Sequence, residues 1–318
     1  MLALRVEKKG LAVRDIERPK NGSEALVRVL LSGICNTDLG IAQGYAKFIG
    51  TIGHEFVGVV ERSSQKELIG KRVVGEINAG CGKCKLCFAG DPRHCAKRTV
   101  LGIVDRDGAH AEFLKLPATN LFEVPESITN EEAAFTEPLA AACGILERAA
   151  IENSDRIGVV GDGKLGLLCA QVLATTGAEV VVIGKHKTKL DIVARRGIKT
   201  LTRKSVAEET GKLDVVVEAS GSSDGFQLAL ELLKPKGRLI LKSTFPGTTA
   251  FDASKIVVNE ISVIGSRCGR FGPALDLLQR GAVDVASLIS EEYALDRGVG
   301  AMSRAAQRGV LKVLLRPS

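Results

Sequence analysis

Tryptophan is absent from this 318-residue chain, and tyrosine occurs only twice. Proteins that bind single-stranded nucleic acid stack bases on aromatic side chains, so this scarcity argues against that class of function. The formal net charge of +7 would suit a polyanionic partner, but the Lys and Arg residues are scattered along the sequence. We therefore expect no nucleic-acid partner. The positive charge suits a phosphorylated small molecule equally well.

Long hydrophobic runs are also missing. No apolar run approaches the length of a membrane span, and residues 1–5 reach a charge before the hydrophobic segment of a signal peptide could form. Hydrophobic residues make up 45% and charged residues 25% of the chain, as in soluble globular proteins. We expect a cytoplasmic protein without a membrane partner. Its eight Cys residues would then be reduced thiols or metal ligands.

The hydrophobic pattern divides the chain into two kinds of structure. Up to about residue 140, short β-branched or apolar runs bounded by turn formers indicate strands and loops at 25–31, 56–60 and 71–74. Farther on, strands at 156–160, 179–183, 214–218 and 238–241 alternate with helices at 164–176, 187–196 and 226–233. This alternation predicts an α/β fold with a parallel sheet covered on both faces. The remaining elements are expected to be a strand at 256–265, a helix at 273–279 and a terminal strand at 310–315.

Four Cys residues have the spacing C-x2-C-x2-C-x7-C, at Cys81, Cys84, Cys87 and Cys95. Four thiolates this close in sequence can surround one tetrahedral zinc and leave no open position, which is typical of a structural site. Two disulfides are the alternative. Nothing else in the sequence indicates an oxidising compartment, so the zinc interpretation is favoured.

A glycine-rich motif, G-x-G-x-x-G, follows the strand at 156–160 and begins the next helix; it comprises Gly161, Gly163, Lys164, Leu165 and Gly166. In this context the pattern is typical of dinucleotide binding, because the glycines allow a tight turn and a close approach of the pyrophosphate to the helix N-terminus. The alternative is a glycine-rich strand–helix turn without a ligand.

The end of the following strand bears on the choice between NAD and NADP. An NAD site has Asp or Glu there for the ribose 2′-hydroxyl, but this chain has Gly184 followed by Lys185, His186, Lys187 and Lys189. A small residue leaves room for a 2′-phosphate, and the cations would bind it by charge-assisted hydrogen bonds. The alternative is a solvated basic helix start. We favour NADP(H) over NAD(H).

Three further motifs contain metal-binding side chains. Cys35 lies in S-G-I-C-N-T-D, His54 and Glu55 in G-H-E, and Glu137 in T-E-P-L. With the four-Cys segment and the glycine-rich motif, the chain resembles the zinc-dependent medium-chain dehydrogenase/reductase family (alcohol, sorbitol and threonine dehydrogenases). The resemblance extends over nearly the whole chain.

This resemblance implies two domains. A GroES-like, mostly-β catalytic domain would consist of residues 1–139 and 268–318 and contain a structural-zinc lobe at about 78–97. A Rossmann domain with a doubly wound parallel sheet would occupy residues 140–267. In this family the strand at 256–265 pairs with its copy in a second subunit, which implies a homodimer or homotetramer.

The resemblance also implies roles for individual residues. Cys35 and His54 would ligate a catalytic zinc, and Glu55 and Glu137 compete for the third protein position. Asp38 would orient the His54 imidazole, and Thr37 would bind the substrate hydroxyl and pass on its proton. The cofactor would be bound additionally by residues of later segments, with the pyrophosphate reached by Lys312 and the pocket walls formed by Ala219, Ser220 and Ser243.

The implied activity is zinc-assisted hydride transfer between the carbinol carbon of an alcohol, polyol or sugar and NADP(H). Two alternatives stay open, namely oxidation of an amino acid such as threonine and a zinc-independent enoyl or quinone reductase on the same fold. Cys143, Cys169 and Cys268 have no assigned role, and the first two lie in helical patterns that indicate buried positions.

Overall fold

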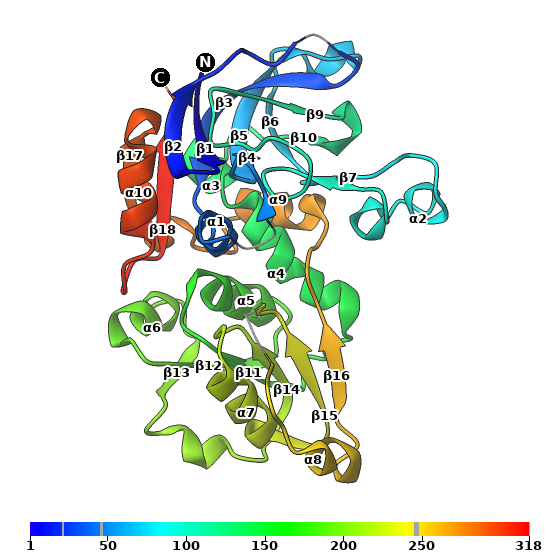
Figure 1. Cartoon of the computed structure of the whole chain (residues 1–318). Helices are drawn as coiled ribbons and strands as arrows, with labels where there is room; N and C mark the ends of the chain where they lie inside the picture. Colours follow the sequence, from blue (N-terminus) through cyan, green and yellow to red (C-terminus); the bar gives the residue numbers. More distant parts are fainter. Residues whose placement is uncertain (21, 45–46, 245–247, 318) are drawn as a thin grey trace. The chain divides into compact units, whose positions relative to one another are not determined.

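The computed structural model describes residues 1–20, 22–44, 47–244 and 248–317 (Figure 1). Two compact units account for the chain. The first comprises Met1–Glu137, Phe271–Arg280 and Leu288–Ser318, and the second comprises Pro138–Arg270 and Gly281–Ser287. The segment 281–287, which the sequence interpretation placed in the first domain, belongs to the second unit.

The first unit is built mainly on one large sheet with the strand order β10-β6-β5-β3-β18-β17, and β9 also pairs with β3. These strands are β3 (Ala25–Gly33), β5 (Glu55–Arg62), β6 (Arg72–Gly75), β9 (Phe113–Leu116), β10 (Leu121–Glu123), β17 (Ile289–Ala294) and β18 (Lys312–Arg316). The C-terminal strand β18 lies between β17 and β3, so both ends of the chain contribute to the sheet.

A smaller sheet with the order β2-β1-β4 completes this unit. Its strands are β1 (Leu2–Glu7), β2 (Gly10–Asp15) and β4 (Gly50–Thr51). The helices associated with the first unit are α1 (Asn36–Ala42), α3 (Asn130–Ala133), α9 (Phe271–Gln279) and α10 (Gly298–Ala305). Thr129 and Glu132 form a reciprocal capping box at the start of α3.

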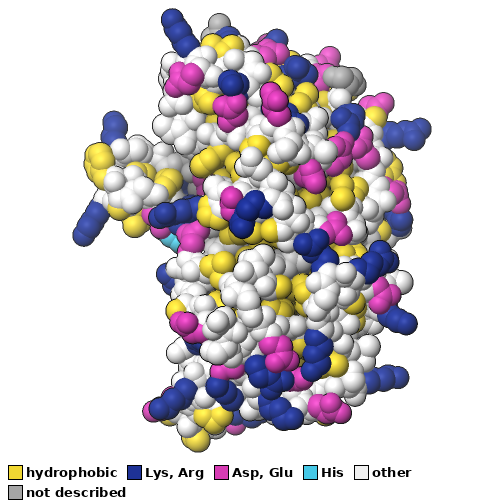
Figure 2. All heavy atoms as spheres, turned by 180° about the vertical axis from the view of Figure 1, so that it is seen from behind, with side chains coloured by type: hydrophobic (Ala, Val, Ile, Leu, Met, Phe, Trp, Pro, Cys, Tyr) yellow, Lys and Arg dark blue, Asp and Glu magenta, His cyan; other side chains and the backbone are white. Residues whose placement is uncertain are grey.

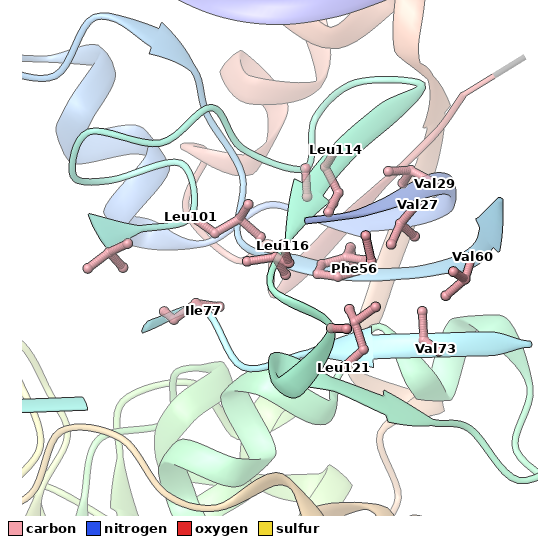
Figure 3. Close-up of a cluster of buried hydrophobic side chains, with 14 residues drawn as sticks. Val27, Val29, Phe56, Val60, Val73, Ile77, Leu101, Leu114, Leu116 and Leu121 are labelled. Carbon is pink, nitrogen blue, oxygen red and sulfur yellow. The ribbon is translucent and has the colours of Figure 1, made fainter. Parts of the chain in front are cut away.

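Inward-facing residues of the large sheet form a hydrophobic core. Val27 and Val29 of β3, Phe56 and Val60 of β5, and Val73 of β6 all point into it (Figure 3). The short β-branched runs predicted as strands therefore serve as buried faces of β3, β5 and β6. This core supports the strand ends from which the functional side chains extend.

The four-Cys segment stands out from the first unit as a lobe, visible at β7 and α2 in Figure 1. It consists of β7 (Asn78–Ala79), α2 (Lys85–Phe88), the short helical turn Pro92–His94 and β8 (Thr99–Val100). β7 and β8 pair in an antiparallel manner at the base of the lobe.

The second unit has a six-stranded parallel sheet with the order β13-β12-β11-β14-β15-β16. Its strands are β11 (Arg156–Val160), β12 (Glu179–Gly184), β13 (Lys199–Thr202), β14 (Leu213–Glu218), β15 (Leu233–Leu241) and β16 (Ser262–Gly265). Its helices are α5 (Lys164–Ala174), α6 (Lys187–Ala194), α7 (Ser223–Leu232) and α8 (Ala253–Val258), and α4 (Thr136–Arg148) contains the unit boundary. This strand order is that of a doubly wound dinucleotide-binding fold, with its switch point between β11 and β14.

One predicted element is wrong in part. The strand expected at 256–265 is limited to β16, and residues 256–258 belong to helix α8. The side chain of Asp252 accepts a hydrogen bond from Ser254 N and caps this helix. The local cap therefore outweighs the β-propensity of the Ile-Val-Val run.

Within the part of the chain that the structure describes, no helix is both long and apolar enough to cross a membrane. Figure 2 shows that, on the face it presents, Lys and Arg side chains are interspersed with Asp and Glu.

Candidate metal and cofactor sites

Three side chains of the first unit converge on one point. Cys35, His54 and Glu55 each contribute a potential ligand atom, and these atoms lie within 4.8 Å of one another. Cys35 lies just after the end of β3, His54 immediately precedes β5, and Glu55 is the first residue of β5. The two strands pair in an antiparallel manner with Gly33 opposite Glu55, which brings the end of one beside the start of the other. Sheet register thus assembles the group from residues about 20 positions apart.

Glu55 is fully buried, and its two carboxylate oxygens have different surroundings. Oε2 forms an ion pair with the ammonium group of Lys312, which also donates to the carbonyl oxygen of Ile34 at 3.3 Å. Oε1 is buried, and none of the described residues provides a hydrogen-bond partner for it. A buried carboxylate oxygen without a partner is costly unless a cation binds it. Together with the Cys thiol and His imidazole, it matches the donor set that zinc prefers, so these residues fit a zinc ion.

Lys312 was expected to reach the cofactor pyrophosphate. Its side chain is only 1% exposed, and its ammonium group is paired with Glu55 and lies 5.5 Å from the ring centre of Phe135. In this structure the ammonium group of Lys312 therefore neutralises a buried carboxylate of the first unit. Contact with a pyrophosphate stays a prediction that requires this ion pair to open.

Asp38 connects the backbone and side chains around the metal-binding group. Its carboxylate is fully buried and accepts hydrogen bonds from Cys35 N at 2.8 Å and Gly53 N at 3.2 Å. Oδ1 lies 3.2 Å from Nδ1 of His54, so Nε2 is the ring nitrogen left to bind a metal ion. Although burial acts to raise it, the His54 and His110 side chains hold the pKa of Asp38 well below its usual range. The carboxylate therefore stays ionised and fixes the orientation of His54.

His110 was not identified from the sequence. It is fully buried, its Nε2 lies 3.5 Å from Oδ2 of Asp38, and its Nδ1 lies 2.9 Å from the hydroxyl of Ser32. The side-chain partners of His110, Ser32 and Asp38, lie far away in the sequence, with Ser32 at a separation of 78, so no local motif indicates these contacts. His110 forms a further layer behind Asp38.

Thr37 and Glu137, both predicted from the resemblance, also lie near the group. The Thr37 hydroxyl is 3.8 Å from the Cys35 sulfur. Burial raises the pKa of Glu137 to about 7, and the charges of His54 and Glu55 are close enough to affect it in opposite directions. The compact ligand group itself contains Glu55 and not Glu137. Without a metal, the geometry places Glu55 closer to the other two ligands.

The four Cys residues of the lobe form a second group. The sulfur atoms of Cys81, Cys84, Cys87 and Cys95 lie within 4.8 Å of one another, and all four are free thiols. Burial and the neighbouring Cys84 raise the pKa of Cys87 to about 11. Four converging sulfurs without a disulfide fit a closed tetrahedral zinc site.

The other three Cys residues lie apart from these groups. Cys143 in α4 and Cys169 in α5 are buried, as expected from their helical patterns, and Cys268 is half-buried. Burial raises the pKa of Cys143 to about 12 and that of Cys169 to about 11, so neither is an activated thiol.

In the second unit, the glycine-rich motif forms the turn between β11 and α5. Gly161 has a φ of +126°, which favours glycine, and Gly161 N donates to the carbonyl oxygen of Ile183 at 2.9 Å. A Cβ on Gly166 would come within 2.2 Å of the carbonyl oxygen of Gly161, so this position requires the close packing that only glycine allows. Gly163 is the N-cap of α5, followed by Lys164 and Leu165. The turn thus presents a helix N-terminus at the carboxyl edge of the sheet, where such folds bind pyrophosphate.

The remaining cofactor candidates lie at the carboxyl ends of neighbouring strands. Ala219 and Ser220 follow β14, and Ala219 N donates to the carbonyl oxygen of Val160 at 2.9 Å. The Ser243 hydroxyl, after β15, accepts from Gly221 N at 2.9 Å. Gly184 ends β12, and Lys185, His186 and Lys189 lead into and occupy the first turn of α6. All therefore lie along one edge of the sheet.

Asp162, inside the glycine-rich motif, is a second residue that sequence reasoning missed. It is 9% exposed, and its Oδ2 accepts hydrogen bonds from Lys185 N and His186 N, both at 2.6 Å. The motif predicts the turn but assigns no role to this position. Its partners lie on the next strand–helix connection.

Comparison with known proteins agrees with this geometry. Residues 21–126 match the model of the alcohol dehydrogenase GroES-like domain, and residues 165–280 match that of the zinc-binding dehydrogenase. A sorbitol dehydrogenase from Halalkalibacterium halodurans is 30% identical over 96% of this chain and 95% of its own length.

Two solved structures share the whole fold. A zinc-binding dehydrogenase from Sinorhizobium meliloti bound to NADP has a TM-score of 0.91 and 30% identity, with 99% of each chain covered. An Escherichia coli alcohol dehydrogenase complexed with NADH also has a TM-score of 0.91, with 27% identity and 99% of each chain covered. The GroES-like and Rossmann architecture and the two groups of potential metal ligands agree with these relatives. The chain therefore belongs to the zinc-dependent medium-chain dehydrogenase/reductase family, as an oxidoreductase of the alcohol and polyol dehydrogenase type.

Proposed function

We propose that this enzyme binds two zinc ions and transfers hydride between a polyol, sugar or secondary alcohol and NADP(H). The observation that carries the proposal is the convergence of Cys35, His54 and Glu55, together with the buried Oε1 of Glu55, for which no hydrogen-bond partner lies among the described residues. The four-Cys lobe supplies the second, closed site. Relatives without zinc chemistry would have no reason to retain the first group.

The chemistry divides between the metal, the cofactor and the chain. When bound, zinc supplies a Lewis acid for the substrate oxygen, and the nicotinamide ring accepts or donates the hydride. Cys35, His54 and Glu55 hold the ion, and Asp38 keeps Nδ1 of His54 oriented toward itself. We expect Thr37, whose hydroxyl lies 3.8 Å from the Cys35 sulfur, to accept the proton of the substrate hydroxyl and pass it on.

Glu137 could serve this chemistry in either of two ways. Its pKa of about 7 makes it a carboxyl group that can hold or release a proton near neutral pH. Alternatively, the ionised Glu137 carboxylate would hold the zinc ion in place of Glu55. A carboxylate in this position, together with the relative named as a sorbitol dehydrogenase, supports a polyol or sugar as the leading substrate class. Oxidation of threonine is the runner-up.

The preference for NADP(H) is supported by the first turn of α6. This helix has no acidic residue in its first turn and no side-chain cap, while Lys187 and Lys189 lie there. Positive side chains at a helix N-terminus are unfavourable unless an anion offsets them. The Asp162 carboxylate, which accepts hydrogen bonds from Lys185 N and His186 N, offsets part of this charge, and a 2′-phosphate beside Gly184 would add a further anion for the lysines.

An oligomer is also part of the proposal. β16 is an edge strand, and the exposed side chains near it include Val257 at 73%, Val258 at 77% and Val263 at 44% exposure. Exposed edges with apolar neighbours are typical of pairing surfaces. We propose a homodimer or homotetramer, which light scattering on the wild type and on Val258→Glu would test. A monomeric wild type would contradict it.

The main experiment is reduction of NADP and, separately, NAD by the zinc-loaded protein with a panel of polyols, aldoses, secondary alcohols and threonine. Turnover with NADP and polyols or sugars is expected. Cys35→Ser should lose turnover and one zinc ion while retaining cofactor affinity, and Cys268→Ser is the matched control. Turnover that survives Cys35→Ser would support the zinc-independent reductase alternative instead.

A further inference from the structure

The connection between β12 and α6 is held by a side chain from another loop. Asp162 receives backbone N–H groups of Lys185 and His186 on one carboxylate oxygen, each at 2.6 Å. Nδ1 of His186 lies 3.0 Å from the same oxygen. Because an ionised carboxylate can only accept, Nδ1 must carry the proton in this contact. The carboxylate therefore fixes both the turn and the imidazole ring.

The same side chain fills the space above Gly184. A Cβ built on Gly184 would lie 2.7 Å from both Cβ and Oδ2 of Asp162 and 2.9 Å from its Cγ. Gly184 is not among the residues with positive φ, so its backbone would accept any side chain. Asp162 is thus what requires glycine at this position.

Position 184 is where a doubly wound fold that uses NAD places its ribose-binding carboxylate. We propose that Asp162 is a specificity-determining residue of the cofactor site. Its side chain excludes a carboxylate from position 184. The carboxylate of Asp162 itself cannot take over binding of the ribose hydroxyl, because it is only 9% exposed and already accepts hydrogen bonds from N–H groups of the protein. This inference rests on the proposed use of NADP(H).

Charge reinforces the steric effect. Asp at position 184 would place a second carboxylate against Asp162, at a separation where like charges repel strongly. Space and charge therefore both oppose the residue that an NAD site needs, and the two effects can be separated by substitution.

The test is a double-mutant cycle between positions 162 and 184. Its first readout is the melting temperature of the cofactor-free protein. Gly184→Ala adds only the Cβ that meets Asp162, so it should lower the melting temperature of the wild type. In an Asp162→Gly background all three contacting atoms are gone. There the same substitution should raise the melting temperature, because replacing glycine at a compatible backbone position restricts the unfolded chain. A change of the same sign in both backgrounds would overturn the inference.

The second readout is binding of two cofactor fragments, 2′,5′-ADP and 5′-AMP, by calorimetry. Gly184→Asp alone should weaken both by about tenfold, a coupling typical of residues in contact. Asp162→Gly/Gly184→Asp should regain 5′-AMP affinity and keep the loss for 2′,5′-ADP. If Gly184→Asp misfolds, recovery of folding by Asp162→Gly is itself the expected coupling.

Asp162→Asn separates charge from space. It retains the atoms that meet residue 184, so Asp162→Asn/Gly184→Ala should stay as destabilised as Gly184→Ala alone. The proposal would be refuted if the single variant Gly184→Asp bound 5′-AMP more tightly than 2′,5′-ADP and kept the 5′-AMP affinity of the wild type. A wrong NADP preference can be distinguished from a wrong role of Asp162. In the first case the wild type itself would bind 5′-AMP more tightly than 2′,5′-ADP, whatever the cycle shows.

Discussion

Replacing Lys312 by Met should destabilise the zinc-free protein more than the zinc-loaded protein. Lys312 is 1% exposed and paired with Glu55, which is fully buried. Removing one partner of a buried ion pair costs about 3–5 kcal/mol, because the remaining charge is left uncompensated. Zinc at Oε1 would supply a cation to the stranded carboxylate and recover part of this cost.

The size of the recovery sets the change in zinc affinity. If zinc restores half of a loss of about 4 kcal/mol, linkage requires that the variant bind zinc about 2 kcal/mol more tightly, or roughly thirtyfold. Denaturant unfolding with and without zinc measures the first quantity. Competition with a chromophoric chelator measures the second. The four-Cys site contributes equally to wild type and variant and cancels in the comparison.

Lys71→Met is the matched control. Lys71 pairs with Glu123 across two side chains that are 48% and 54% exposed, so its loss should cost about 0–1 kcal/mol with or without zinc. Equal destabilisation of Lys312→Met in both states would refute the reasoning. It would mean that Glu55 does not bind zinc, and Glu137 would become the carboxylate ligand.

Three further predictions concern the metal sites. Cys95→Ser, at a 1% exposed thiol, should remove one zinc ion per chain and lower the melting temperature while the Cys35 site still binds zinc, as metal analysis will show. His110→Asn should weaken zinc binding by about tenfold through a less constrained Asp38, measured by chelator competition; unchanged affinity would make His110 a packing residue only. Although burial acts to lower it, Asp38 and Cys35 raise the pKa of His54 well above its ordinary value, which favours the protonated imidazole in the metal-free protein. Zinc must displace that proton, so affinity should rise as pH increases above the ordinary histidine value, with proton release in weakly buffered titrations; a flat profile would contradict this.

Local pattern was sufficient for most of the fold. The parallel strands β11, β12 and β14 and the glycine-rich turn follow from apolar runs and glycine spacing, which depend on neighbours in sequence. The strand prediction for residues 256–258 was wrong because these β-branched residues lie within a helix capped by Asp252. A short apolar run is compatible with either structure until the cap is recognised.

The residues that sequence reasoning missed have their partners far along the chain. His110 contacts a hydroxyl 78 positions earlier, and Asp162 contacts His186 at a separation of 24. Motifs identify side chains that meet a ligand, but these two act on other residues. Their roles depend on how strands are placed beside one another, which no local spacing encodes.

The position of the C-terminal strand β18 between β3 and β17 has a consequence for biosynthesis. Glu55 and Lys312 are separated by 257 positions, and the whole of the second unit's main segment is made between them. At a synthesis rate of about 5–20 residues per second, the carboxylate waits roughly 10–50 s for its ammonium partner. During that interval Cys35, His54 and Glu55 have already left the ribosome, so a zinc ion bound there as proposed would reach them before Lys312 does. Metal supply during translation would then decide how many nascent chains reach the last strand with this site already assembled.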